Sequence, residues 1–400
     1  MRGEIYFAQK RCLYSGCESD SGRKTVDTGK VNILHVLTSL PVGGVENMLL
    51  KVVNGYNTDR FRASICCIRE GGDIAEKLLA AGYEVTILGR MKGKGFDWGA
   101  VRELRILCQK RKTDILRTHQ YHANLYGRIA GVLAGVPVII PSFHNRYCSP
   151  EKPKMHRRLL NHVLGYWSDR IVAVSEAVLE DVVRYDHIAP AKMQVIHNGV
   201  ELERFRTSLS KEEARDKLQL PQEFFLIGAA GRLTEQKGHK VLIKAASSAG
   251  RVAVVLAGDG PCRGELDSLA RSLGVRCFFL GRISPEQMPV FFRSLDLFCF
   301  PSFWEGFPSA LVEAMAAGLP IIASDISPHR EALGDAGLLV QVGGAEQLTD
   351  AIQKCRRPAE RTALEQAAFS RAEIISIGRT VMAYEALFED CLQKKGRLHR

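Results

Sequence analysis

Two glutamates stand in a segment that is otherwise mostly apolar. The segment reads PSFWEGFPSALVEAMAAGLPIIASD from Pro301 to Asp325, and its carboxylates are Glu305 and Glu313. Carboxylates that flank the free N–H groups of a helix start suit a ligand with hydroxyl groups on both sides of a phosphate. A nucleotide sugar has that order of groups. Two solvated glutamates would give the same pattern, so both interpretations stay open on these residues alone.

Two cations follow another strand-like run, in AAGRLTEQKGHKVLIKA. Arg232 and Lys237 lie between Gly231, where the strand is expected to end, and a helix expected to start near Gly238. Arginine offers a planar fork to phosphate oxygens, and lysine offers a point charge. Together they can neutralise a diphosphate and stabilise it as a leaving group without a metal. The loop is not a Walker A motif, because GxxxxGK[ST] is absent.

Three further segments carry weaker signals. Gly43 and Gly44 follow the first strand-like run, where glycines let backbone amides approach a ligand. His119 ends the run TDILRTH, as a candidate acid or base or as a structural histidine. The stretch LAGDGPCRGEL has the spacing GxGxxxG rather than GxGxxG, and it comes mid-domain. We therefore interpret it as a strand-to-helix turn and exclude a dinucleotide site.

Short apolar runs alternate with helical patterns from Val31 onward, and they must position these residues. Examples are VNILHVLTS, ASICCI, EVTILG, RCFFLG and LPIIAS. This alternation predicts βαβ units, that is, doubly wound parallel sheets covered by helices on both faces. The turn-rich segment HNGVELERFR interrupts the rhythm, so we expect two such domains. The expected ranges are a disordered tail (1–30), an N-terminal Rossmann-like domain (31–205), a nucleotide-sugar domain (206–371) and a final helix crossing back (about 372–392).

These elements predict where the candidate site residues lie. We expect a helix over Ser309 to Ala317 with Ser309 as its N-cap and Gly318 just past its end. Glu305 then lies in the turn before the helix, and Glu313 in its second turn. Open α/β sheets bind ligands at the carboxyl ends of their strands, so two such domains predict a site in the cleft between them.

Composition excludes several classes. The chain has 400 residues, 46% of them hydrophobic and 25% charged, as ordinary globular proteins do. The net charge of +11 comes from scattered basic residues, which argues against a nucleic-acid patch. None of the 11 cysteines forms a CxxC or zinc pattern, so buried reduced thiols are expected. We find no run long enough to span a membrane, and the first 30 residues lack the apolar core of a secretory signal.

The motifs occur in an order that resembles a known family. Gly43–Gly44, His119, VIHNGVELERF, GRLTEQKG, GDGP, LGRISPEQM and EGFPSALVEAMAAGLPIIASD follow one another from Val31 to about Leu392. This order resembles the retaining GT-B glycosyltransferases of family 4, the "group 1" family. The segments around Glu305 and Lys237 are the most specific. One departure is ISPHREAL, where the family often has Gly-Gly before Pro-Glu; that loop is expected near the sugar end.

The resemblance implies a role for each candidate. It implies that Glu313 holds the ribose hydroxyls, that Glu305 contacts the donor sugar, and that Arg232 and Lys237 grip the diphosphate. It places His119 near the sugar. The remaining implied substrate contacts are Gly43, Gly44, Ile283, Phe307, Pro308 and Ser309.

The implied activity is transfer of a sugar from a nucleotide diphosphate sugar, with UDP favoured, to a glycan or lipid-linked acceptor. No metal or other cofactor is expected. The setting implied is surface polysaccharide assembly in the cytoplasm, peripheral to the inner membrane face. An anionic membrane is a candidate partner through the segment 151–167, which also suits an ordinary crossover helix. The alternatives are a nucleotide-sugar 2-epimerase and a non-catalytic GT-B binding protein.

Overall fold

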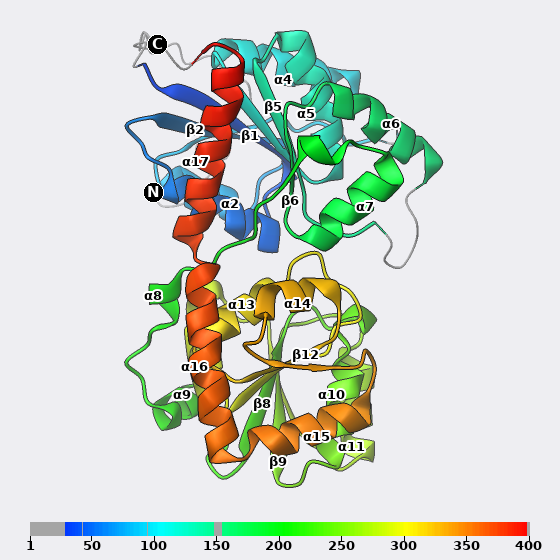
Figure 1. The fold of residues 1–400 in the computed structure, drawn as a ribbon, viewed down its shortest axis with the longest axis vertical. Helices are drawn as coiled ribbons and strands as arrows, with labels where there is room; N and C mark the ends of the chain where they lie inside the picture. The colour runs from blue at the N-terminus through cyan, green and yellow to red at the C-terminus, as the bar shows by residue number, and fades with distance from the viewer. Residues whose placement is uncertain (1–28, 42, 94, 148–153, 398–400) are drawn as a thin grey trace, which may run out of the picture. The chain divides into compact units, whose positions relative to one another are not determined.

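The computed structural model describes residues 29–41, 43–93, 95–147 and 154–397. Almost all of the predicted tail (1–30) lies outside these ranges. The chain forms two compact units (Figure 1). Among the described residues, unit 1 comprises those within 29–174, 178–196 and 381–397, and unit 2 comprises residues 175–177 and 197–380. The chain therefore first passes from unit 1 to unit 2 before residue 205, which is the boundary predicted from the sequence. It returns to unit 1 after residue 380.

Unit 1 contains a seven-stranded parallel sheet in the order β3-β2-β1-β4-β5-β6-β7. Its strands are β1 Val31–Ser39, β2 Phe61–Glu70, β3 Glu84–Ile87, β4 Ile115–His119, β5 Val138–Phe143, β6 Ile171–Ala173 and β7 Met193–Val195. Its helices are α2 Gly44–Gly55, α3 Asp73–Ala80, α4 Trp98–Lys110, α5 Tyr121–Ala134, α6 Met155–Tyr166, α7 Glu176–Asp186, the 3₁₀ turn η1 Pro190–Lys192 and most of α17 Ile377–Lys394.

Successive side chains of a central strand point to opposite faces of this sheet, because side chains alternate along a strand with a period of two residues. Leu34 of β1 and Leu116 of β4 pack in a core with α4 and α5. The next residue along each strand, His35 and Arg117, lies on the other face. There Arg117 stacks its guanidinium on Tyr384 of α17, 3.7 Å from the ring centroid. The alternation therefore fixes which side of unit 1 carries buried polar groups.

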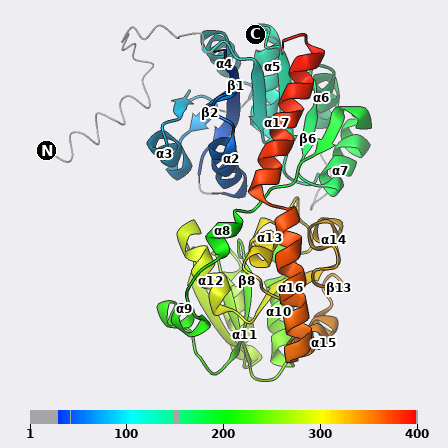
Figure 2. The same ribbon diagram turned by 60° about the vertical axis from the view of Figure 1, so that its left-hand side comes forward.

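Unit 2 contains a six-stranded parallel sheet in the order β10-β9-β8-β11-β12-β13. Figure 2 labels two of its strands, β8 and β13, among the helices of this unit. Its strands are β8 Phe225–Ala230, β9 Val252–Ala257, β10 Arg276–Gly281, β11 Leu297–Phe300, β12 Ile321–Ser324 and β13 Leu338–Val340. Its helices are α8 Leu202–Phe205, α9 Lys211–Lys217, η2 Glu235–Lys237, α10 His239–Ser247, α11 Arg263–Ser272, η3 Pro285–Gln287, α12 Met288–Ser294, α13 Ser309–Ala316, α14 Ser327–Leu333, α15 Ala345–Cys355 and α16 Pro358–Ile374. The prediction of two doubly wound α/β domains is confirmed.

Helices cover both faces of the second sheet. Side chains of α10, α11 and α15 join alternate strand residues such as Ile227 and Cys299 in one apolar core. On the other face, Phe292 of α12 packs edge-on against Phe298 of β11, with ring centroids 5.4 Å apart. Burial of both faces explains why these strands read as continuous apolar runs.

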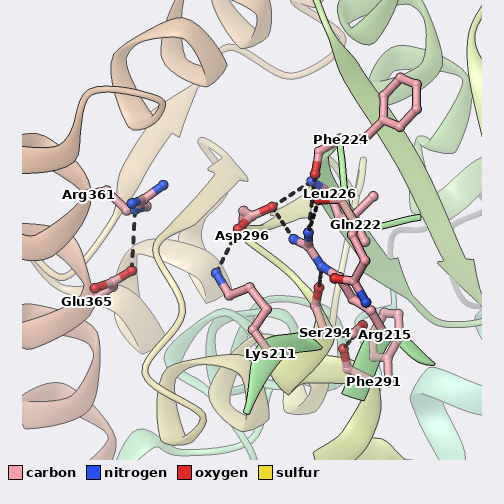
Figure 3. Close-up of polar contacts among 10 residues, drawn as sticks. All are labelled: Lys211, Arg215, Gln222, Phe224, Leu226, Phe291, Ser294, Asp296, Arg361 and Glu365. Atoms are coloured by element: carbon pink, nitrogen blue, oxygen red, sulfur yellow. Dashed lines mark hydrogen bonds and ion pairs between the residues drawn. The ribbon is translucent and has the colours of Figure 1, made fainter. Parts of the chain in front are cut away.

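A buried ion pair fastens α9 to the amino ends of β8 and β11 (Figure 3). Asp296 accepts hydrogen bonds from Arg215 Nη2 at 2.6 Å, from Lys211 Nζ at 2.6 Å and from the Leu226 amide at 2.8 Å. Arg215 also donates from Nε to the Ser294 carbonyl at 3.0 Å. Both charged groups are buried and have several partners, which is the condition for a buried ion pair to be tolerated.

The final helix predicted over about 372–392 is two helices, α16 and α17. The chain leaves the helical conformation at Ile375 and Ser376, where Ser376 forms a β-bridge with Val200. The Val200 amide donates to the Ile375 carbonyl at 2.9 Å, and the Ile377 amide donates to the Val200 carbonyl at 2.8 Å. Pairing with a distant segment therefore interrupts a pattern that sequence presents as one helix.

The remaining sequence expectations concern membrane spans and thiols. Across the described ranges, no helix is long and apolar enough to cross a bilayer. The eight cysteines described are free thiols, and six of them are buried. Burial raises the pKa of Cys67 and of Cys108 to about 12, which keeps these thiols protonated.

Candidate functional site

The second sheet has a topological switch point between β8 and β11. Strand order runs outward in opposite directions from this pair, through β9 and β10 on one side and β12 and β13 on the other. Open α/β sheets bind their ligands outside the carboxyl ends of strands at such a point. The loop after β8 carries Arg232 and Lys237, and the loop after β11 carries Glu305.

Glycines allow these two loops to approach each other. Gly231 has φ +139° and Gly238 has φ +65°, both in the region that favours glycine. A Cβ atom on Gly238 would lie 2.0 Å from the Pro301 carbonyl oxygen, at the end of β11. Gly238 also serves as the N-cap of α10, which begins at His239; the sequence predicted a helix start near Gly238. A side chain at this position would push the two loops apart.

Lys237 and Glu305 meet at the switch point. Lys237 Nζ lies 2.6 Å from Glu305 Oε1 and 4.8 Å from the centroid of the Phe300 ring. The side chains are largely shielded, with 17% of Lys237 and 8% of Glu305 exposed. Arg232, in the same loop, is exposed. The structure thus joins one cation and one carboxylate that are far apart in sequence and leaves a second cation open to solvent.

A residue that sequence reasoning missed joins the same loops. The Gln236 side chain donates to the Trp304 carbonyl at 2.8 Å, and the Gln236 carbonyl accepts from the Phe303 amide at 2.8 Å. Gln236 immediately precedes Lys237, and Trp304 immediately precedes Glu305. No spacing or residue type in the sequence marks this glutamine, because its partners are backbone groups of a distant segment.

Helix α13 differs from the prediction at its start. It begins at Ser309, with Pro308 in the cap position and no side-chain cap, so Ser309 is not the N-cap. Its end agrees with the prediction, because Gly318 follows the last turn with φ +71°. Glu313 lies in the second turn and is half-buried. The start of the helix therefore presents backbone N–H groups between Glu305 and Glu313.

The segment just before α13 is held by a buried aromatic contact. Phe307 is 8% exposed and stacks on His197, with ring centroids 5.1 Å apart and an interplanar angle of 21°. His197 is paired with Glu331 of α14. Phe307 and Pro308, two implied substrate contacts, are thus buried, whereas Ser309 is half-buried.

Two other segments have definite places. The turn 258–262 joins β9 to α11, as predicted; Gly258 has φ +142°, and a Cβ there would lie 1.9 Å from the Gly231 carbonyl oxygen. Ile283, two residues after β10, is half-buried. The segment ISPHREAL, expected to be a loop, contains helix α14 because Pro328 starts a helix well.

Two family profiles match the chain, one in each unit. The profile for "Glycosyl transferases group 1" matches residues 210–370. The profile for "Glycosyltransferase Family 4" matches residues 42–204. Together they cover the greater part of the chain, and they meet near the predicted domain boundary.

This chain is a family 4, group 1 glycosyltransferase. Among similar proteins, UDP-Gal:alpha-D-GlcNAc-diphosphoundecaprenol alpha-1,3-galactosyltransferase of Escherichia coli is 27% identical over 340 residues, which are 81% of this chain and 87% of that protein. D-inositol 3-phosphate glycosyltransferase of Mycolicibacterium smegmatis is 32% identical over 233 residues, which are 55% of this chain and 52% of that protein.

Solved structures confirm the predicted GT-B fold of the glycosyltransferase. Anabaena Alr3699/HepE, crystallised in complex with UDP and glucose, matches with a TM-score of 0.79 and 22% identity. The match covers 90% of this chain and 100% of that chain. At this identity the likeness establishes the fold alone.

The glycosyltransferase has a second switch point, between β1 and β4 of unit 1. Gly43 and Gly44 follow β1; Gly43 is the N-cap of α2, and Gly44 begins the helix. His119 is the last residue of β4. Gln120, the next residue, has φ +68° and donates from its side chain to Glu46 Oε1 at 2.8 Å. The predicted unit 1 residues therefore lie at the edge where such sheets bind ligands.

His119 is the middle member of a buried row of three imidazoles, which sequence reasoning missed. Its Nε2 lies 3.2 Å from His35 Nδ1, and its Nδ1 lies 3.4 Å from His144 Nε2. Burial, together with the Arg117 cation, holds the pKa of His35 and of His119 well below the ordinary value and lowers that of His144 to about 3. A ring nitrogen of His119 can reach a ligand only if one of these contacts opens.

Metal ligands were not expected in this glycosyltransferase. In the described part of the chain, no three His, Cys, Asp or Glu side chains gather as a group that could hold a metal ion. Metal independence remains a prediction that needs a direct test.

Proposed function

We propose that this glycosyltransferase moves a sugar from a nucleotide diphosphate sugar to a glycan or lipid-linked acceptor, with UDP as the favoured nucleotide. We further propose that transfer retains the anomeric configuration and needs no metal. The observation that carries the proposal is the Lys237–Glu305 contact at the switch point of unit 2. The UDP-linked names of the E. coli relative and the Anabaena structure support the choice of base.

Each residue has a distinct task in this proposal. Arg232 and Lys237 neutralise the diphosphate, assisted by the backbone N–H groups at the start of α13. Glu313, one turn into α13, accepts hydrogen bonds from the ribose hydroxyls. Glu305 accepts from a hydroxyl of the donor sugar and is held in place by Lys237 Nζ. Gly43, Gly44 and His119 are proposed as substrate contacts at the switch point of unit 1.

The proposed step is front-face substitution. The acceptor hydroxyl oxygen forms a bond to the anomeric carbon while the bond from that carbon to the diphosphate oxygen breaks. The hydroxyl proton passes to the departing diphosphate, so charge and atoms balance. Charge develops on the diphosphate as the bond breaks, and Arg232 and Lys237 stabilise it there. Preorganised charge of this kind contributes about 10²–10³-fold per group.

Isothermal titration calorimetry tests the donor site. UDP, GDP, ADP and CMP would each be titrated, with chelator and with Mg²⁺, into the wild type and the Glu313→Ala variant. We expect UDP to bind equally well with chelator. Because a hydrogen bond to a charged group is lost, Glu313→Ala should weaken binding roughly tenfold to a hundredfold.

The control is Glu223→Ala, which removes an exposed carboxylate elsewhere in unit 2. It should leave the affinity unchanged. If no nucleotide binds the wild type, the donor-site proposal fails and a non-catalytic binding protein becomes the better account. Conversion of the nucleotide sugar into its 2-epimer instead of a transfer product would favour the epimerase. NMR of the product's anomeric centre tests retention.

We also propose that α6 of unit 1 lies on an anionic membrane surface. Met155, Leu159 and Tyr166 follow one another at helical spacing and are 72%, 65% and 70% exposed. Helix α6 contains two arginines, Arg157 and Arg158, and no acidic residue. An apolar face on a cationic helix suits an interface with anionic lipid. A membrane position would bring the enzyme to a lipid-linked acceptor.

Vesicle pelleting tests this surface. The wild type should pellet with vesicles containing phosphatidylglycerol at low salt, and less at high salt. Leu159→Glu should reduce binding at least about tenfold, because an apolar side chain no longer enters the lipid. Ile106→Glu, which changes a 50% exposed apolar residue on α4, is the matched control and should bind normally. Equal binding by both variants would refute α6 as the contact.

A further inference from the structure

Unit 2 contains a cavity of about 440 Å³ behind the loops that carry Lys237 and Glu305. Its walls come from Thr234, Glu235, residues 238–241 and Lys244, from the start of α11, from Phe303 and Trp304, and from residues near the start of α15. Lys237, Glu305 and Glu313 do not line it. Its volume lies within the usual range for small-molecule sites.

Part of the cavity lining is apolar and aromatic. Val241 of α10 and Leu266 of α11 line it, together with Trp304 and Phe303. Phe303 is 39% exposed, so part of its ring is accessible to a ligand. These groups suit a flat apolar ring, because aromatic faces stack and lose contact with water.

Two lysines, Lys240 and Lys244, and one carboxylate, Glu235, also line the cavity. Lys240 and Lys244 lie one turn apart on α10, and the helix N-terminus adds a partial positive charge. Lys240 is paired with Glu265 at 2.5 Å, and Lys244 forms no ion pair with any described residue. His239, also in the wall, is 3% exposed, and its Nδ1 has no hydrogen-bond partner in the described part of the chain. An anion is the ligand group that complements these features.

We propose that this cavity binds a small aromatic anion, with its ring against Val241, Trp304 and Phe303 and its phosphate or carboxylate near Lys244. We further propose that the bound anion changes how the enzyme holds its donor. The second part rests on the proposed function, because it requires Lys237 and Glu305 to contact the donor.

The coupling has a physical route through two short loops. The ligand would contact Phe303 and Trp304, directly before Glu305, and Thr234, Glu235 and Gly238, which flank Lys237 in its loop. Gln236 ties the two loops together through its side chain and its carbonyl. A ligand that shifts Trp304 therefore acts on Gln236, and Gln236 immediately precedes Lys237. Occupation of the cavity should change the KM for the donor more than kcat.

Tryptophan fluorescence tests the site with phenyl phosphate as the probe. The chain has three tryptophans, so Trp98→Phe with Trp167→Phe leaves Trp304 as the reporter. We expect saturable quenching in the millimolar range or below. Lys244→Ala should weaken binding about fivefold, as for one exposed charge pair. Val241→Phe should abolish it by filling the cavity. Lys217→Ala, which removes an exposed lysine of α9, should have no effect.

The outcomes separate this proposal from the donor site. If UDP displaces phenyl phosphate competitively, the probe binds at the diphosphate site of the donor. If phenyl phosphate does not quench the fluorescence, the cavity does not bind it. Either result overturns the proposal. An unchanged donor KM at saturating probe overturns the coupling. If the titration succeeds while the enzyme fails to bind any nucleotide, the cavity stands and the proposed function falls.

Discussion

Lys237 and Glu305 act as one unit in the proposed site. Because their charged atoms are 2.6 Å apart and largely shielded, removal of either leaves the other unpaired. We predict that Lys237→Ala and Glu305→Ala each lower kcat/KM about 10²–10³-fold. In the double variant, kcat/KM should fall by far less than the product of the two single-variant fold-changes, because residues in contact are coupled. Steady-state kinetics of sugar transfer measure all three.

Urea unfolding of the same variants checks that they remain folded. Strictly multiplicative losses would show that the two side chains contribute independently, and wild-type rates in both single variants would refute their assignment to the site.

The sequence predicted the residue types of the site better than their contacts. Glu305, Glu313, Arg232 and Lys237 stand in segments whose spacing is specific. Nothing in the spacing shows that Lys237 pairs with Glu305, 68 positions away. The imidazole row was missed for a similar reason. His35 lies within an apolar strand, and its approach to His119 depends on β1 pairing with β4, a register that single-strand patterns do not reveal.

At the scale of elements, the Asp296 network fastens α9 to the second sheet (Figure 3). We predict that Asp296→Ala lowers the free energy of unfolding of unit 2 by about 3–5 kcal/mol, because the buried Arg215 guanidinium loses its counter-charge. The matched control is Glu365→Ala, which removes an exposed i,i+4 pair with Arg361 on α16. It should change stability by less than about 0.5 kcal/mol. Urea denaturation monitored by circular dichroism measures both, and equal effects would contradict the account.

Strands were easier to predict than helix ends. The strands read as short apolar runs between turn residues, so the bounds of β1 and β10 agree with the sequence to the residue. Helix ends depend on distant partners. The break between α16 and α17 comes from the Val200 bridge, and the start of α13 comes from a loop that Phe307 anchors. The distant partners are Val200 for the break and His197, on which Phe307 stacks, for α13. Neither adjoins its helix in sequence, so periodicity could not reveal these contacts.

Across the molecule, four buried histidines and one half-buried histidine, His144, should make stability depend on pH. They are His35, His119 and His144 in unit 1 and His239 and His329 in unit 2. Burial lowers the pKa of His239 and of His329 to about 4. The unfolded chain takes up protons near the ordinary histidine pKa of about 6.5, whereas the folded chain does not. Stability should therefore fall as pH drops from about 6.5 towards 4, by up to about 1.4 kcal/mol per pH unit for each histidine.

Urea unfolding at several pH values measures this slope. Asp186 opposes it weakly, because burial raises its pKa to about 6 and favours the protonated folded form as pH falls. His239→Gln should reduce the slope for unit 2 whatever it does to absolute stability. His156→Gln, at an exposed position on α6, should leave the slope unchanged. A stability that does not vary between pH 6.5 and pH 4.5 would disprove the prediction.

The division of the chain into two units also determines which unit is synthesised completely first. A ribosome delivers residues 197–380 before residues 381–400, so all of unit 2 after its short first segment exists while unit 1 still lacks its last piece. That piece carries Tyr384, which stacks on the Arg117 guanidinium, and Phe388, which packs edge-on against the rings of Tyr56 and Phe61. Until it arrives, one face of the first sheet stays uncovered around a buried cation. The nascent protein must therefore complete its first unit last.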